Sequence, residues 1–567
     1  MVSKAYVDFV ESHRTLPEGA QRLGDVAPDE NIEVSVYLKP RPDTSPADAA
    51  LRATDRRTAL RARRAVQHRD DIRLLTEFAI DNGLTVSEVD PGRRLVKLSG
   101  PASSMQSAFG TTLGIYDDGK QQFRARTGVL RLPQDLLSVV EAVLGLDTRP
   151  AARPLFVRAE GPVDPEVVTG HLPNAVGTLY SFPTGLTGAG QCIGIVELGG
   201  GYNESDIVAA FAAMGLATPT VVAVSVDGGQ NAPGGSDDVE VALDIQVAGG
   251  VAPGSRIAVY FAPNTFESFV NAITQAALDP VNGPSVISIS WGAVEGFWAD
   301  MDRNSMNSAL ADAAGVGVSV FVAAGDSLAT CGVNDGKVHV IFPASSPSAI
   351  GCGGTTIDTT GNTINSEVVW NDHNNIFGTG GGISDFFPVP DFQQSANLPV
   401  SVNDGQRRRG VPDIAADAAL ASGYLIVLRG SPWQVGGTSA VAPLWAGLTA
   451  LINQAARGPS IGFFLPALYQ NPQLMRDITQ GDNKVRGLGY SAGPGWDACT
   501  GLGVPIGSAL EQAASIRCFG CRRAVEAAQV AFDACASDPA CPKRALIALG
   551  KRLRLAKATL QTCEQQH

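Results

Sequence analysis

"QCIGIVELGG", residues 191–200, is a short and almost continuously apolar stretch that ends in glycine, a pattern typical of a strand buried on both faces of a sheet. Similar stretches follow it at 220–228, 256–263, 285–292 and 317–326. Helical patterns lie between them, near 204–214, 237–250, 265–278 and 301–315. This alternation predicts an α/β fold with a doubly wound parallel sheet covered by helices. In such folds functional groups gather outside the carboxyl ends of the strands.

The flanking regions have a different character. Residues 1–150 combine an alternating strand at 31–40 with an arginine-rich helical stretch over about 51–82, which predicts a compact α+β unit. The proline-rich run at 147–166 shows no apolar periodicity and is expected to be an exposed linker. We therefore expect four parts, with boundaries at 1–150, 151–170, 171–514 and 515–567.

Charge is distributed unevenly along the chain. Residues 1–150 carry 21 Lys and Arg against 21 Asp and Glu, residues 151–514 carry 13 against 31, and residues 515–567 carry nine against four. A central region so poor in basic groups argues against nucleic acid as a partner, because phosphates need Lys and Arg. No apolar run is long enough to predict a membrane span, and the start "MVSKAYVDFV" shows no apolar core of a secretory signal.

"GGTSAVAPLW", residues 436–445, places Ser439 after two glycines and before an apolar run that reads as a buried helix. Such a serine either caps the helix or acts as a nucleophile whose oxyanion forms beside free amides. A nucleophile needs a base, and histidine is the usual one. His171 lies near the linker, His339 alternates with valines and His373 sits in a polar loop, so none is placed as a base would be.

Carboxylates offer a better base. Glu240 and Asp244 are spaced i, i+4, so they share one face of a helix that is otherwise almost wholly apolar. Burying two carboxylates is costly, which indicates a function for them, although solvated surface charge is the usual meaning of such a pair. Asp326 ends the strand at 317–326, as a turn residue or as a functional group. Together these residues make a complete acyl-transfer site: Ser439 attacks, Glu240 and Asp244 handle the proton, and protonated Asp326 donates to the oxyanion.

Several motifs, taken in order, resemble the sedolisin family of serine-carboxyl peptidases, and the kumamolisin type in particular. They are "EVALDIQVAGGVAPGSRIAVYFAP", "SISWG", "AAGDS", "GGTSAVAPL" and "AGPGWDACTGLG", together with "FRARTGVLRLP" in the first 150 residues. The resemblance implies a Ser439–Glu240–Asp244 triad with Asp326 at the oxyanion. It also implies a network extended through Glu197 and Trp291.

The same resemblance implies the fold and a cofactor. It predicts a subtilisin-like catalytic domain over 171–514, a ferredoxin-like activation prosegment over 1–150, and a processing site in the linker. It also implies one calcium ion, held by Asp477, the carbonyls of Ile478, Gly493 and Gly495, and Asp497. Carboxylates and carbonyls on bent loops suit a hard cation.

The last 53 residues lie outside the resemblance. They read as two helices that carry five cysteines, Cys518, Cys521, Cys535, Cys541 and Cys563. In an antiparallel pair we expect disulfides Cys535–Cys541 and Cys521–Cys563, with Cys518 left over; the competing interpretation is a zinc site. Disulfides would indicate an oxidising compartment, so we expect an extracellular protein.

These observations predict an acid-active serine endopeptidase, made as a self-processing zymogen whose prosegment is its intramolecular inhibitor. Its substrates are proteins or peptides, and we expect a monomer. Carboxylates in place of histidine predict a bell-shaped rate centred at about pH 3–5. The alternative is a catalytically silent binding protein that retains the peptidase fold.

Overall fold

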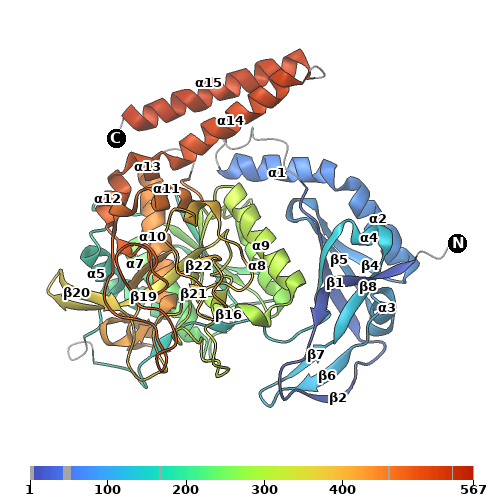
Figure 1. Ribbon diagram of the computed structural model, residues 1–567, viewed down its shortest axis with the longest axis horizontal. Helices are drawn as coiled ribbons and strands as arrows, with labels where there is room; N and C mark the ends of the chain where they lie inside the picture. Colours follow the sequence, from blue (N-terminus) through green and yellow to red (C-terminus); the bar gives the residue numbers. More distant parts are fainter. Residues whose placement is uncertain (1–4, 42–52, 165–168, 457–459, 539–540, 566–567) are drawn as a thin grey trace.

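The computed structural model describes residues 5–41, 53–164, 169–456, 460–538 and 541–565. Its central unit, which lies beside the N-terminal unit in Figure 1, contains an eight-stranded sheet. The strand order is β13 (Val221–Ser225), β14 (Arg256–Phe261), β12 (Cys192–Glu197), β15 (Val286–Ile289), β17 (Ser319–Ala323), β19 (Ile350–Thr360) and β20 (Thr363–Val369), with β23 (Ile414–Asp417) also paired to β19. All of these pairings are parallel except that of β19 with β20. The five predicted strands are therefore confirmed as neighbours in one sheet.

Helices cover both faces of this sheet. On one face α7 (Asp238–Val251) packs against α10 (Thr438–Ala456), and on the other α8 (Phe266–Leu278) packs against α9 (Asp300–Gly315). Every residue of α7 is buried, as its nearly uniform apolar composition predicts. Smaller helices of this unit are α5 (Pro173–Leu179), α6 (Glu204–Ala213), α11 (Leu465–Gln470) and α12 (Gly507–Gln512). The layering is that of a doubly wound α/β fold.

The N-terminal region forms a separate sheet beside the first. Its strand order is β4 (Thr85–Asp90), β5 (Leu95–Pro101), β3 (Asn31–Leu38) and β9 (Val140–Leu144), all antiparallel. Helices α1 (Ala53–Gln67) and α2 (Arg69–Asp81) join β3 to β4, and α3 (Ala102–Ala108) follows β5. This β-α-β-β-α-β arrangement is the ferredoxin-like fold that was expected. Further short elements are β1 (Tyr6–Arg14), β2 (Gln21–Asp25), β6 (Gly114–Asp117), β7 (Gln122–Ala125), β8 (Gly128–Pro133) and α4 (Gln134–Leu137).

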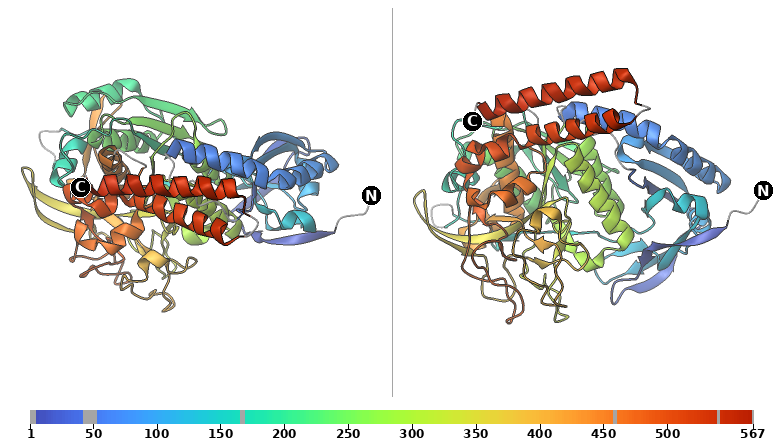
Figure 2. Two further views of the ribbon diagram at one scale, coloured as in Figure 1. Left: turned by 90° about the horizontal axis from the view of Figure 1, so that it is seen from above. Right: turned by 45° about the horizontal axis from the view of Figure 1, so that its top comes forward.

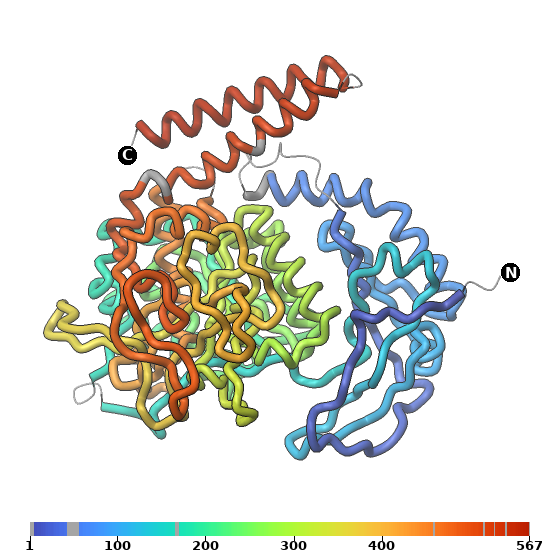
Figure 3. The backbone as a smooth tube through the Cα atoms, viewed as in Figure 1, coloured from blue at the N-terminus to red at the C-terminus, as the bar shows by residue number. Residues whose placement is uncertain are grey.

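The chain then crosses from the N-terminal unit into the central one, as the tube in Figure 3 shows. The prediction of an exposed linker is wrong for the start of this segment. Ala151, Ala152, Leu155 and Val157 are buried. Two short strands, β10 (Arg153–Pro154) and β11 (Val157–Arg158), pair antiparallel with β16 (Trp291–Val294) and β25 (Ser431–Gly436). Residues 165–168 of the predicted linker lie outside the described residues.

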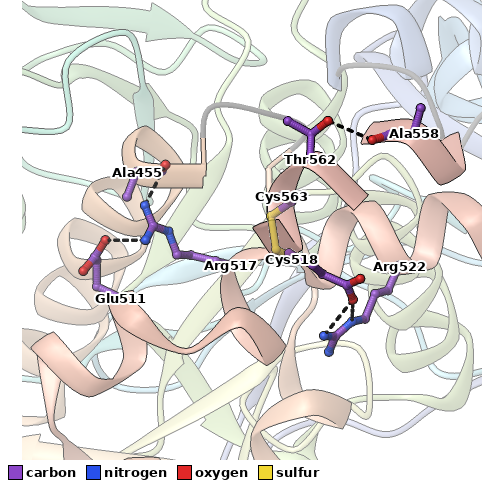
Figure 4. Close-up of a disulfide and its surroundings, with 9 residues drawn as sticks. Ala455, Glu511, Arg517, Cys518, Arg522, Ala558, Thr562 and Cys563 are labelled. Atoms are coloured by element: carbon purple, nitrogen blue, oxygen red, sulfur yellow. Dashed lines mark hydrogen bonds and ion pairs between the residues drawn. A yellow bond between two sulfur atoms is a disulfide. The ribbon is translucent and has the colours of Figure 1, made fainter. Parts of the chain in front are cut away.

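The C-terminal region is the predicted helical hairpin, built from α14 (Phe519–Ser537) and α15 (Lys543–Gln565) after the short α13 (Ala514–Arg517). It lies along one side of the molecule, close to α1 of the N-terminal unit in both views of Figure 2. One expected disulfide, Cys535–Cys541, is present, but the second joins Cys518 to Cys563 rather than Cys521 to Cys563 (Figure 4). The zinc interpretation is wrong, because four of the five cysteines are bonded in pairs.

Cys518 and Cys521 lie three residues apart, so both face the same side of the hairpin, and spacing alone does not decide which one bonds Cys563. Cys521 is a free thiol buried beside that disulfide. Arg517, one residue before Cys518, donates to the carbonyl of Ala455 and pairs with Glu511 (Figure 4). These contacts anchor the base of the hairpin on the central unit. In the part of the chain that the structure describes, no helix is both long and apolar enough to cross a membrane.

Candidate active site

Ser439 is the second residue of α10, and the turn before it depends on glycine. Gly437 has φ +110°, and a side chain there would collide with Asp326 and with the backbone of residues 155 and 156. The Ser439 hydroxyl does not cap its helix. It donates instead to Oε2 of Glu240, at 2.9 Å, in a fully buried position. The geometry therefore does not support a capping role for Ser439. Its hydroxyl instead contacts a carboxyl group, as a nucleophile with a carboxyl base would.

Glu240 and Asp244 project from the buried helix α7 toward this serine. Asp244 Oδ1 accepts a hydrogen bond of 2.8 Å from Ser290, whose hydroxyl also lies 3.3 Å from the carbonyl oxygen of Ser439. Among the described residues, Oε1 of Glu240 and Oδ2 of Asp244 have no hydrogen-bond partner. Burial raises the pKa of Glu240 and of Asp244 well above the usual range, and the nearby Asp244 raises that of Glu240 further. These carboxyls are therefore arranged to hold protons.

Glu197 and Trp291 extend the same buried network. Glu197 is the last residue of β12, and its Oε2 accepts a hydrogen bond of 2.8 Å from the indole nitrogen of Trp291. Its other oxygen is unpartnered within the described chain. Burial and the proximity of Asp244 raise the pKa of Glu197 well above the usual range. Three carboxyls thus share one dry region, where full ionisation would be very unfavourable.

Asp326 follows β17 at the carboxyl end of the sheet, on the opposite side of Ser439. Its Oδ1 accepts from the backbone nitrogen and the hydroxyl of Thr438, at 2.8 and 2.7 Å. Its Oδ2 has no partner in the described part of the chain. Burial raises the pKa of Asp326 to about 7, against the opposing effect of the Thr438 hydrogen bonds. A proton on Oδ2 would make it a hydrogen-bond donor aimed into the site.

The segment 153–158 lies across this site. The Leu155 carbonyl accepts a hydrogen bond of 3.0 Å from the Ser439 amide. The Leu155 amide donates to the Ser290 carbonyl at 3.0 Å and to Glu240 Oε2 at 3.1 Å. Sequence reasoning missed Leu155, Ser290 and Thr438. Their only signal is position, next to the linker prolines, to "SISWG" and to Ser439.

The three histidines considered as bases lie elsewhere. His171 forms a bridge with Tyr424 and approaches Thr359, and His339 pairs with Asp335 at 3.0 Å. His373 sits in an exposed loop with φ +56°. The side chain that accepts the hydrogen bond from the Ser439 hydroxyl is Glu240.

The residues expected to bind calcium come from two loops that lie together. Asp477 Oδ2 accepts a hydrogen bond of 2.7 Å from the Gly495 amide. Asp497 Oδ1 accepts from the amides of Cys499 and Thr500, both at 2.9 Å. Burial raises the pKa of Asp497 to about 6. In the described residues no ion pair joins Asp477 or Asp497 to a lysine or arginine. The buried Asp497 and the nearby Asp477 therefore have no cationic side chain as a partner there.

Comparisons with known proteins agree with this architecture. The family described as "Pro-kumamolisin, activation domain" matches residues 18–149, and "Subtilase family" matches residues 220–474. Kumamolisin of Bacillus sp. (strain MN-32) is 45% identical over 524 residues, which cover 88% of this chain and 95% of that protein. Sedolisin of Pseudomonas sp. (strain 101) is 33% identical over 456 residues, 74% of this chain and 75% of its own.

A solved structure of Pseudomonas sedolisin, a serine-carboxyl proteinase complexed with pseudo-iodotyrostatin, superposes with a TM-score of 0.56 at 32% identity. The match covers 62% of this chain and all of that one. More than a third of this chain therefore has no counterpart in that solved structure.

Proposed function

Because this chain belongs to the sedolisin family of serine-carboxyl peptidases, and is therefore a serine-type peptidase made with an activation prosegment, we propose that Ser439 is its nucleophile. The observation that carries this proposal is the 2.9 Å hydrogen bond from the Ser439 hydroxyl to Glu240. Glu240 is the general base, and Asp244 lies behind it with a free oxygen that can share the proton. Glu197, held by Trp291, continues this network as a positioning residue.

Asp326 and the Ser439 amide form the oxyanion site. The amide already binds the Leu155 carbonyl, and both Asp326 Oδ2 and the oxygen of this carbonyl border the space next to Gly437. A protonated Asp326 donates to the oxygen as negative charge develops on it. An ionised Asp326 repels that charge. Stabilisation of the oxyanion therefore requires a pH below the Asp326 pKa of about 7.

Activity is expected below neutral pH for a second reason. Burial raises the pKa values of Glu197, Glu240 and Asp244. These three carboxyls therefore keep protons at pH values at which exposed carboxyls would have lost them. Glu240 must still accept the serine proton, so one carboxyl of the cluster has to be ionised. Rates therefore fall both in strong acid and near neutrality. A bell-shaped profile centred at about pH 3–5 is our working expectation.

The prosegment supports latency at neutral pH by placing its own linker in the site. A substrate cannot pair with β16 and β25 while residues 153–158 occupy both strands. Acidification makes Asp326 a donor and allows the enzyme to cut this linker in cis. The enzyme is then an acid-active endopeptidase whose prosegment is inhibitor and first substrate.

One calcium ion would fit the loops at 477–478 and 493–497. The fit rests on Asp497, a buried carboxyl that pairs with no lysine or arginine in the described residues. Asp477, Asp497 and the carbonyls of Ile478, Gly493 and Gly495 would hold the ion. Bound there, it supplies positive charge that ties two loops together, with no part in the reaction.

The experiment that tests the function uses Ser439→Ala beside the parent protein. On brief acid treatment the parent is expected to lose its prosegment, as seen on a denaturing gel, while the variant stays at full length. The variant should also show no peptidase activity at any pH from 2 to 9. Processing of the pure variant would show that Ser439 does not cut the linker, and an unprocessed, inactive parent would favour the silent binding protein.

A further inference from the structure

The linker lies in the site in a single register, and that register identifies one peptide bond. The Leu155 carbonyl is the one that accepts from the Ser439 amide, and its oxygen and Asp326 Oδ2 both border the space next to Gly437. On the amino side of Leu155, Arg153 and Pro154 pair with Gly292 and Trp291. On the carboxyl side, Val157 and Arg158 pair with Gly436 and Val435.

Given the proposed function, on which this step rests, we infer that the first bond cut is Leu155–Phe156 and that the enzyme selects an aliphatic residue before the bond. The linker adds a strand to each side of the site, so main-chain hydrogen bonds fix its position and side-chain pockets set its specificity. Only one peptide, Leu155–Phe156, lies between the two short ladders with its carbonyl on Ser439. The choice of bond follows from this register.

The pocket around Leu155 explains the selectivity. Leu155 is 2% exposed and packs in a small apolar cluster with Val294, Ala323, Cys331 and Ile341. The Cys331 thiol lies 3.2 Å from the His339 carbonyl oxygen, and burial raises its pKa to about 12, so it is neutral in acid. The four side chains that pack around Leu155 are uncharged. A charged residue before the bond would lose hydration on entering this apolar cluster.

Arg153 and Arg158, the two arginines of this segment, are held more loosely than Leu155. Arg153 is exposed and reaches the Cys331 carbonyl at 3.3 Å and the Ser327 hydroxyl at 3.4 Å. Arg158 lies over the Trp433 ring, 5.2 Å from its centroid. Such exposed contacts contribute little discrimination compared with a filled apolar pocket. The pocket lined by Cys331 is therefore the main determinant of where the enzyme cuts.

Cleavage of this bond needs only side chains of this protein and one water molecule. Ser439 Oγ bonds to the Leu155 carbonyl carbon while Glu240 takes the hydroxyl proton. That proton passes to the Phe156 nitrogen as the C–N bond breaks, which leaves Phe156 as a new amino terminus. Water then adds to the Leu155 ester, giving a free carboxyl at Leu155 and restoring the serine hydroxyl.

The first test is intact-mass analysis of the full-length zymogen at short times after acidification. We expect the first large product to begin at Phe156, at a rate independent of protein concentration. Leu155→Lys should slow the appearance of this product at least 100-fold, whereas Leu155→Met should change it less than fivefold. A first cut at another bond in an active enzyme would overturn the register and leave the proposed function intact. Absence of any cleavage from pH 2 to 7 would overturn both.

A second test examines the pocket in the matured enzyme, so that it does not depend on zymogen folding. The substrate is a synthetic peptide with the sequence of residues 150–161, PAARPLFVRAEG, with Leu, Phe or Lys before the scissile bond. Leu should exceed Lys at least 100-fold in kcat/KM. Cys331→Ala enlarges the pocket and should raise the Phe-to-Leu ratio at least fivefold. Cys192→Ala, which removes another buried thiol in β12, should leave that ratio unchanged; an unchanged ratio in Cys331→Ala would remove Cys331 from the pocket.

Discussion

Asp326 is the residue at which pH should act most directly. Its pKa lies at about 7 with the linker in place, so it is protonated below that pH and ionised above it. Asp326→Ala removes an oxyanion donor and is expected to lower kcat about 10²–10³-fold at acidic pH. Asp326→Asn keeps a permanent donor, because its amide does not titrate. Steady-state kinetics of the matured variants from pH 2 to 9 would measure both effects.

The alkaline limb of the pH profile provides the sharper readout for Asp326. In the parent enzyme kcat should fall as pH rises through about 7, since kcat reports the occupied site. The alkaline limb of kcat/KM should lie at lower pH, because this parameter reports the free enzyme. In the free enzyme the open cleft lets water reach Asp326, which lowers its pKa. Asp326→Asn should move or abolish the limb in kcat. If the Asn variant kept the parental limb, another group would be responsible for the loss of rate.

Single residues differ in how well the sequence revealed them. Glu240 and Asp244 were predictable because a helix that is apolar on nearly every face makes its charges conspicuous. Leu155 was not, because its role depends on a contact with Ser439, 284 positions away in the chain. Thr438 fixes Asp326 through two hydrogen bonds, but a threonine before a serine carries no such signal. The carboxyls and Ser439 were thus predicted, whereas Leu155, Ser290 and Thr438 were missed.

At the scale of elements, the hairpin of α14 and α15 depends on its disulfide. Cys518–Cys563 closes a loop of 45 residues, and losing such a link costs about 4 kcal/mol in the chain-entropy account. Cys563→Ser should therefore make the hairpin much more sensitive to an added protease under non-reducing conditions. Cys521→Ser is the matched control and should keep both disulfides, as peptide mapping would show. Mapping that finds Cys521 bonded to Cys563 in the parent would contradict this pairing.

Calcium is expected to act on the loops at 477–478 and 493–497. A ligand that binds only the native state raises stability with its concentration, by about 2.7 kcal/mol at 100 times Kd. Excess chelator should therefore lower Tm, and added calcium should restore it. Asp497→Asn removes the buried carboxyl and should make Tm insensitive to both treatments. An unchanged parental Tm in chelator would remove the calcium proposal.

The linker shows where element prediction failed. Its prolines and lack of periodicity are typical of an exposed loop. Pro154 nevertheless lies in the short strand β10, where its lack of an amide hydrogen is tolerated. Arg153 and Arg158 are exposed, whereas Leu155 and Val157 are buried, and no periodicity in the sequence marks this difference. The burial follows from the strands β16 and β25 that lie beside the segment. Partners distant in sequence, rather than local propensity, decided this segment.

At the scale of the whole molecule, prosegment and catalytic unit meet through buried charges of opposite effect. Asp312 on α9 binds Arg64, at 2.5 Å, and Arg94, at 3.3 Å, both from the prosegment. Burial alone would raise its pKa, but Arg94 and Arg64 hold the pKa of Asp312 below its usual value. Glu267 on α8 is half-buried near Ser35 of the prosegment, and loss of solvent around its carboxyl raises its pKa to about 8. Acid should therefore loosen the prosegment at Asp312 but not at Glu267.

The signs follow from linkage. Asp312, with a depressed pKa, contributes stability above the pKa of a free aspartate, about 3.9, and loses it as pH falls through the docked value. Glu267, with a raised pKa, contributes stability below the value of a free glutamate, about 4.3, and loses it as pH rises through about 8. Acid therefore weakens docking at one group and strengthens it at the other.

Two variants in the uncleavable Ser439→Ala background separate these effects. Asp312→Asn leaves Arg64 and Arg94 less compensated and should destabilise the zymogen by about 3 kcal/mol at pH 7, with a smaller effect near pH 2–3. Glu267→Gln removes an acid that must take up a proton on folding at pH 7, because its folded pKa of about 8 lies above that pH, and should raise Tm at pH 7 but not at pH 3. Glu77→Gln, in an exposed pair with Arg73 on α2, should have almost no effect. Melting curves at pH 3, 5 and 7 measure all three, and if Asp312→Asn had the same effect at every pH, the Asp312 carboxylate would not be the group through which acid loosens the prosegment.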